Sequence, residues 1–86
     1  MKRYFKHEAE SDLDAGVAYL EFEGEWAIHQ VEKYNDRWFC SNKEYHPEIG
    51  PTLADQPLSE MEFKPEYEIS SEEFEGVWEE AMKHCE

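Results

Sequence analysis

The residues of this 86-residue chain that are best suited to holding a metal ion are four histidines and two cysteines. Structural zinc sites need spacings such as C-x2-4-C or H-x3-5-H, because ligands at those distances can reach one tetrahedral ion. The chain shows neither spacing, so we expect no metal site and no cofactor. The six residues are His7, His29, His46, His84, Cys40 and Cys85.

Carboxylates could bind a cation or transfer protons at two places. The acidic run 8–14 lacks the glycine and the late glutamate of an EF-hand loop, so at most weak cation binding is expected. Glu72 and Glu73 lie on a solvated helix face, where no desolvated pocket adjusts their pKa for acid–base work. Cys40 is expected to pack as a small apolar residue. Since no phosphate loop or nucleophile motif is present either, we predict no enzymatic activity and no catalytic residues.

The charge of the chain is strongly negative and unevenly distributed. The net charge is −14, of which residues 1–43 carry −3 and residues 44–86 carry −11. Binding to phosphate groups needs clustered Lys and Arg, so neither nucleic acid nor an anionic membrane is an expected partner. A basic protein surface would complement this charge, whereas an acidic surface that serves only solubility is the alternative.

The N-terminus and the cysteines bear on location. The start M-K-R-Y-F-K-H-E has no apolar segment of the kind that secretory signals contain. No apolar run reaches the roughly 18 residues that cross a bilayer. We therefore expect a single cytoplasmic domain over residues 1–86, with Cys40 and Cys85 as free thiols.

The clearest element is a C-terminal helix over residues 70–84. Ser70 is a good N-cap, and Glu73 three residues later completes a capping box. Because Gly76 interrupts the helix, we expect another part of the backbone to approach it closely. One face of the helix carries an apolar stripe at i, i+3, i+4, i+7 and i+8, which we expect to pack on a platform of strands. The stripe consists of Phe74, Val77, Trp78, Ala81 and Met82.

The first half of the chain is rich in aromatic and β-branched residues and predicts a β-meander. We expect tight turns at Glu23-Gly24 and Asn35-Asp36, and an acidic turn over Glu10–Gly16. The expected strands are Lys2–Glu8, Val17–Phe22, Glu25–Tyr34 and Arg37–Lys43.

Residues 44–62 contain three prolines and predict an irregular loop with one short helical turn at Leu58–Glu60. Residues 63–69 are expected to be extended. The loop should be held against the core by four apolar side chains: Ile49, Leu53, Leu58 and Met61.

Two-residue turns would fix which side chains share a face of the sheet. The face with the smaller residues suits helix packing, and His29 is expected there as a hydrogen-bonded core histidine. That face would carry Ala18, Leu20, Phe22, Ala27, His29, Val31, Trp38 and Cys40. The opposite face has more rings than a solvated face needs, and a large exposed apolar patch usually marks an interaction site. Its candidate protein-interaction residues are Tyr19, Trp26, Ile28, Tyr34 and Phe39.

Two alternatives to this assignment stay open. The loop over residues 44–62 could fold over the aromatic face and bury it. A longer turn with a bulge would exchange some residues between the faces.

Three segments resemble a bacterial family of small acidic domains of unknown function. They are E-W-A-I-H-Q-V-E-K-Y-N-D-R (25–37), A-D-Q-P-L (54–58) and F-K-P-E-Y-E-I-S-S-E-E-F-E-G-V-W (63–78). The chain departs from the family pattern at Asn35-Asp36-Arg37, which lacks a glycine. The resemblance implies no activity and no catalytic residues, and some similar small acidic bacterial proteins are immunity partners of toxins.

Together these patterns predict an α+β fold: a small antiparallel β-meander of three to five strands with one C-terminal helix packed on one face. The function we expect is that of a non-catalytic protein-interaction module that binds another protein or forms a homodimer. The alternative is an acidic inhibitor or immunity-like protein that neutralises a basic partner.

Overall fold

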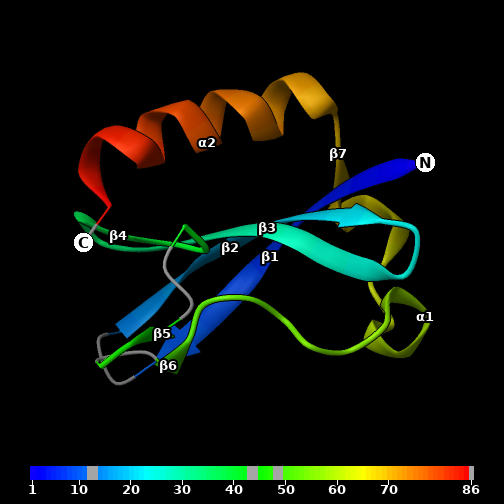
Figure 1. The fold of residues 1–86 in the computed structure, drawn as a ribbon, viewed down its shortest axis with the longest axis horizontal. Helices are drawn as coiled ribbons and strands as arrows, with labels where there is room; N and C mark the ends of the chain where they lie inside the picture. Colours follow the sequence, from blue (N-terminus) through cyan, green and yellow to red (C-terminus); the bar gives the residue numbers. More distant parts are fainter. Residues whose placement is uncertain (12–13, 43–44, 48–49, 86) are drawn as a thin grey trace.

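The structure is a computed structural model that describes residues 1–11, 14–42, 45–47 and 50–85, with one long helix above one main sheet (Figure 1). The sheet has the strand order β4-β3-β2-β1-β7, all antiparallel, and β5 and β6 form a separate pair. This confirms the predicted α+β class. The elements are β1 (Lys2–Ser11), β2 (Asp14–Glu23), β3 (Trp26–Tyr34), β4 (Arg37–Cys40), β5 (Tyr45–His46), β6 (Gly50–Pro51), α1 (Leu58–Met61), the 3-10 helix η1 (Pro65–Tyr67), β7 (Glu68–Ile69) and α2 (Ser71–His84).

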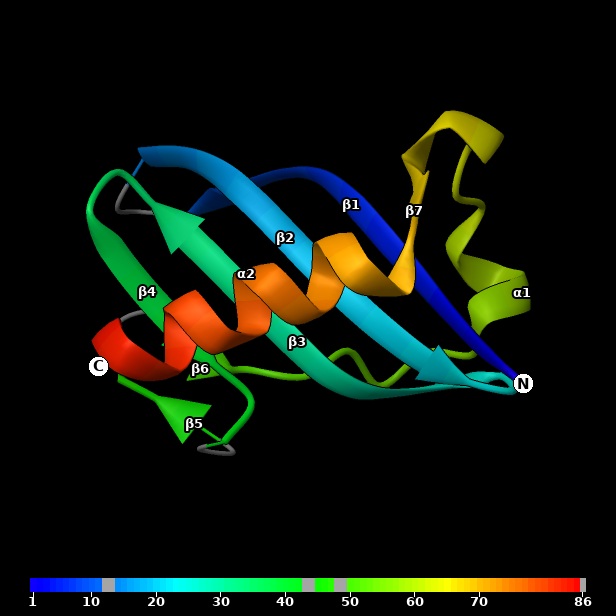
Figure 2. The same cartoon turned by 90° about the horizontal axis from the view of Figure 1, so that it is seen from above.

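The helix α2 forms where its cap and apolar stripe predict it. The Ser70 hydroxyl accepts a hydrogen bond from the Glu73 N–H (3.1 Å), and this bond satisfies one of the free donors at the helix start. Seen from above, α2 runs across β2 and β3 (Figure 2). Phe74 and Ala81 of the stripe are buried, whereas Met82 is 39% exposed, so its predicted core position is wrong.

The connection between β1 and β2 differs from the expected acidic turn over Glu10–Gly16. The two strands stay paired as far as Ser11 and Asp14, and Gly16 pairs with Ala9 inside the ladder. A Cβ atom at Gly16 would overlap the Lys33 carbonyl oxygen and the Tyr34 ring. This glycine therefore serves close packing in a strand and not a turn.

A register shift in β3 changes which residues share a face. Glu23 pairs with Trp26, so Gly24 and Glu25 form the turn one residue later than predicted, and Gly24 takes a positive φ of 63°. Phe22 pairs with Ala27, but Glu21 pairs with His29, which leaves Ile28 as an extra residue. Such a bulge moves every later residue of the strand to the opposite face.

The predicted helix-packing face is consequently split between the two sides of the sheet. Val31 and Cys40 lie under α2 with Ala81, and Tyr19 and Trp38 pack against them. The other half of the predicted set, Ala18, Leu20, Phe22 and Ala27, forms a second core cluster with Phe5 on the side away from α2.

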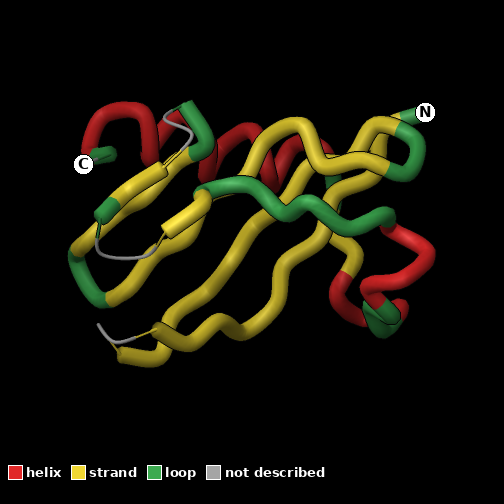
Figure 3. The backbone as a smooth tube through the Cα atoms, turned by 60° about the horizontal axis from the view of Figure 1, so that its bottom comes forward, coloured by secondary structure: helices red, strands yellow, loops and turns green. Residues whose placement is uncertain are grey.

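The loop after β4 covers that second cluster (Figure 3). Leu53, Leu58 and Met61 pack on it as predicted, whereas Ile49 lies outside the described residues. The predicted short helical turn appears as α1, Leu58–Met61. The strand predicted over Arg37–Lys43 ends at Cys40, and the stretch 63–69, expected to be extended, contains η1.

The cysteines are paired and not free, which corrects the expectation of free thiols. Cys40 at the end of β4 and Cys85 directly after α2 form a disulfide, with their Cα atoms 6.0 Å apart. The bond joins the C-terminal end of α2 to the sheet across a sequence separation of 45.

Candidate protein-binding surface

Most of the residues suited to chemistry are taken up by structural contacts. Within the described part of the chain, no group of three or more His, Cys, Asp or Glu side chains could hold a metal ion. Cys40 and Cys85 form the disulfide, and His84 Nε2 lies 3.1 Å from Glu80 Oε1 on the exposed side of α2. The side chain of His46 lies outside those described.

A charged cluster that sequence analysis did not anticipate lies under α2. The Glu21 side chain is only 10% exposed, and its two oxygens contact Lys2 Nζ (3.4 Å) and His29 Nδ1 (2.7 Å). The His29 ring lies 4.7 Å from the Trp78 ring of α2, between centroids. Desolvation, with a smaller contribution from Glu21, raises the pKa of the nearby Tyr4. His29 is hydrogen-bonded as predicted, but its side chain is 47% exposed and so it is not a core residue.

The five candidate interaction residues do not form one exposed face. Tyr34 and Phe39 are buried, at 2% and 1% exposed. Tyr19 packs against the cluster under α2, and Ile28 is half-buried at the bulge. Trp26, beside the turn between β2 and β3, is the exposed member at 56%.

The loop beyond β4 explains part of this burial. The Tyr34 hydroxyl donates to Glu32 Oε1 (2.6 Å), and the Gln30 amide donates to the other oxygen of Glu32 (3.2 Å). The Gln30 side-chain oxygen in turn accepts from the Ala54 N–H (2.8 Å). The covering loop that the sequence left open as an alternative is therefore present over this side of the sheet.

The outward side of α2 is acidic and solvent-exposed. Glu72, Glu75 and Glu79, which we call the acidic helix face, are all exposed. Among the described residues none of the three has an ion-pair partner, whereas Glu80 pairs with Lys83 and His84. Unpaired carboxylates on a rigid helix keep their full charge available to a cationic partner.

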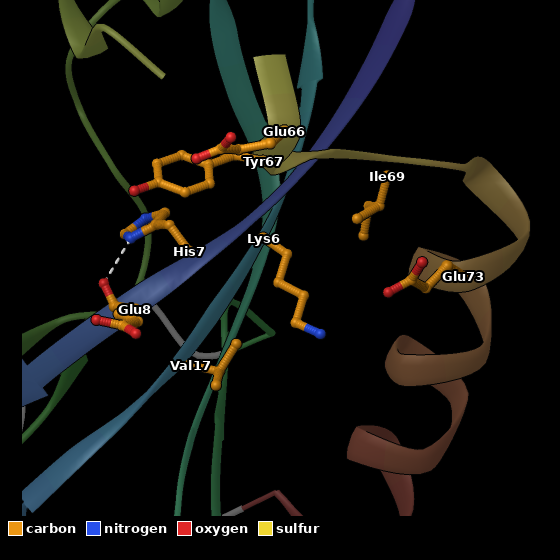
Figure 4. A pocket seen from close by; sticks show the side chains of 8 residues that line it. All are labelled: Lys6, His7, Glu8, Val17, Glu66, Tyr67, Ile69 and Glu73. Carbon is orange, nitrogen blue, oxygen red and sulfur yellow. Dashed lines mark hydrogen bonds between the residues drawn. The ribbon is translucent and has the colours of Figure 1, made fainter. Parts of the chain in front are cut away.

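An open pocket of about 490 Å³ lies where α2 and β7 meet the outer edge of β1 (Figure 4). Val17 and Ile69 give it apolar surface, while Lys6 and Glu73 bring charges of opposite sign. A second pocket, also of about 490 Å³, lies on the side of α1, with Met61 and Phe63 among its lining residues. Three residues line both pockets and so connect them: His7, Glu8 and Tyr67.

An ion pair positions β7 beside this pocket. Arg3 donates from Nε and Nη2 to the two carboxylate oxygens of Glu68, each at 3.1 Å. These hydrogen bonds and the charge of Arg3 hold the pKa of Glu68 below its ordinary value of 4.5, although desolvation acts in the other direction. This ion pair supports the short pairing of β7 with Tyr4 and Phe5, which lie in the N-terminal half of β1.

Comparison of the chain with protein-family models, with curated proteins and with solved structures gives no match. Within the described residues, every helix is too short or too polar to cross a membrane.

Proposed function

We propose that this protein is a non-catalytic binding module whose partner is a basic protein. The observation that carries the proposal is the acidic helix face, where Glu72, Glu75 and Glu79 are exposed and lack an ion-pair partner among the described residues. Complementary charge speeds the encounter of two proteins and suppresses wrong partners more than it adds affinity. A protein that neutralises a basic partner, as an immunity protein does, is one form that such a module can take. The resemblance to a bacterial family of small acidic domains belongs to the same proposal.

Self-association has less support than binding to a basic protein. Burial of Tyr34 and Phe39 removes two of the five rings and apolar side chains on which a self-complementary patch would depend. Two copies would also bring together two chains that each carry a net charge of −14. Like charges at an interface oppose association.

Affinity capture from the native cell extract tests this proposal. We expect a basic protein that is retained at low salt and released at high salt, because screening shortens the range of charge attraction. The triple variant Glu72→Gln, Glu75→Gln, Glu79→Gln should lose this partner. The matched control Glu23→Gln, Asp36→Asn, Asp55→Asn changes the net charge equally at exposed positions off α2 and should keep it. Equal loss in both variants, or a captured partner that is not basic, would overturn the proposal.

The proposal includes a cytoplasmic location, which requires that the disulfide is reduced in the cell. Cytosolic thiols are kept reduced, whereas disulfides persist in oxidising compartments. In the cytosol this bond would be kept reduced, so Cys40 and Cys85 would be thiols there and would form the disulfide of the structure only on oxidation. Trapping thiols at the moment of lysis and counting the blocked cysteines by mass spectrometry distinguishes the two states.

A further inference from the structure

We call residues 6–11 of β1 the uncovered edge, because in the described part of the chain no strand pairs with their outer side. The strand runs from Lys2 to Ser11, but β7 pairs only with Tyr4 and Phe5. Along residues 6–11, β2 occupies one side of the strand, and no described strand occupies the other. Alternate residues of such an edge direct main-chain N–H and C=O groups outward, where another strand can pair with them.

We propose that this edge binds an extended, basic segment of a partner protein by strand addition. The segment would pair with residues 6–11 of β1, on the same side of the strand as β7. The inference rests on the proposed function, and it adds the edge of β1 to the acidic helix face as a second contact with the same partner. Strand addition gives affinity through main-chain hydrogen bonds and specificity through pockets for alternate side chains.

The two pockets beside the edge suit an added strand. One pocket lies on the side of α2 and the other on the side of α1, and both include His7 and Glu8 of β1. Side chains of an extended strand alternate between the two faces of a sheet. A strand laid along residues 6–11 would therefore direct successive side chains into the two pockets in turn.

The charge around the edge selects a basic segment. The pocket on the α2 side includes Glu8, Glu66 and Glu73, against the single lysine Lys6. The pocket on the α1 side adds Glu60 and Glu62 to the shared Glu8. Lysine or arginine side chains in either pocket would meet these carboxylates while their methylene stems lie on apolar surface. A second copy of this protein would instead bring a net charge of −14 to the same place.

A main-chain acceptor near the edge is already within reach of a side-chain donor. The His7 Nδ1 lies 2.7 Å from the Glu8 carbonyl oxygen, and the His7 ring lies beside the Tyr67 ring (Figure 4). The Phe63 ring also lies beside His7, with the ring centroids 5.2 Å apart. Lys6 lies over the Tyr19 ring, with its Nζ 5.8 Å from the ring centroid. Charged edge residues of this kind also discourage uncontrolled pairing between sheets.

The test uses the whole protein and a peptide of alternating lysine and valine, capped at both ends and as long as the uncovered edge. We expect NMR shifts at residues 6–11 and at both pockets, with slower hydrogen exchange at alternate amides of this stretch. The same peptide N-methylated at alternate residues cannot complete the ladder and should not bind. Equal binding of the methylated peptide would overturn strand addition.

Two charge reversals separate this inference from the proposed function. Glu8→Lys should weaken peptide binding about fivefold or more, because it replaces attraction by repulsion at the edge. The matched control Asp36→Lys, at an exposed position in the turn between β3 and β4 and away from both pockets, should change the affinity by less than about twofold. Shifts confined to the acidic helix face would overturn strand addition and leave the proposal of a basic partner unaffected. Absence of any shift would also overturn it, whereas the capture experiment alone decides the proposed function.

Discussion

Two glycines show how much one methyl group can mean at different places in this chain. Gly16 lies in β2, where a Cβ atom would overlap the Lys33 carbonyl oxygen and the Tyr34 ring. Gly76 lies on the exposed side of α2, where a Cβ atom would meet nothing within 4 Å. The close backbone approach that the sequence predicted for Gly76 is therefore found at Gly16.

We expect opposite effects when the two glycines are replaced by alanine. Gly16→Ala should lower the free energy of unfolding by about 1–3 kcal/mol, because the core must move to admit the methyl group. Gly76→Ala should raise it by about 0.5–1 kcal/mol, because alanine is the better helix former. Urea unfolding of the two variants measures both changes. Equal effects, or a stabilised Gly16→Ala, would show that β2 does not approach Tyr34 in this way.

The ion pair between Arg3 and Glu68 predicts a small, directional dependence of stability on pH. Since the folded-state pKa of Glu68 lies below its ordinary value of 4.5, the pair stabilises the fold at neutral pH. This contribution is lost as the pH falls through the folded-state pKa. Wild type should therefore be more stable than Glu68→Gln at neutral pH, and the difference should shrink toward zero in acid. Unfolding curves of both proteins across this range check the sign, and a difference that grows in acid would contradict it.

At the scale of elements, the disulfide holds the end of α2 to β4. Closing a loop over a sequence separation of 45 restricts the unfolded chain and stabilises the fold by about 4 kcal/mol in the chain-entropy estimate. Reductant should lower the urea midpoint of the wild type substantially. Cys85→Ser, a variant that cannot form the bond, should start from the lower midpoint and show no response to reductant. A wild-type midpoint that reductant leaves unchanged would show that the bond does not form or does not stabilise the fold.

The helix could be predicted because its signals are local. Ser70, the acidic first turn and the apolar stripe all lie within 17 residues of each other, and they confirm one another. The β3–β4 turn was equally local, since Asn35 takes the positive φ of 56° that its side chain tolerates.

The faces of the sheet could not be predicted in the same way. One extra residue, Ile28, exchanges the faces of everything that follows it in β3, and no residue type marks the bulge. Because of this bulge, Val31 and Cys40 lie on the same side of the sheet as Tyr19, and the expected aromatic patch does not form. The disulfide was missed for a related reason, because the return of Cys85 to β4 depends on where α2 lies across the sheet.

The acidic part of the candidate binding surface could be predicted from the sequence, and the edge of β1 could not. The excess of carboxylates in residues 44–86 is a compositional fact, and it places Glu72, Glu75 and Glu79 on the polar side of a predictable helix. The uncovered edge of β1 was not visible, because it depends on two unpredicted lengths. β1 continues to Ser11, and β7 is only two residues long.

At the scale of the whole molecule, charge and architecture point the same way. The helix occupies one side of the sheet, and the loop with α1 occupies the other (Figures 1 and 2). Among the described residues, no strand pairs with the outer side of β1 along residues 6–11. The whole chain carries a net charge of −14, which gives the molecule a negative field. Such a field steers basic partners and repels further copies of the chain.

The central claim, recognition of a basic partner through carboxylates, is tested most directly by the association rate constant of the captured protein. Stopped-flow mixing at ionic strengths of about 20 mM and about 500 mM spans the range from weak to strong screening. We expect the association rate constant to fall tenfold or more across this range, as electrostatic steering requires. The dissociation rate should change far less, and the Glu72, Glu75 and Glu79 triple variant should flatten the salt dependence. An association rate constant that salt leaves unchanged would contradict the account.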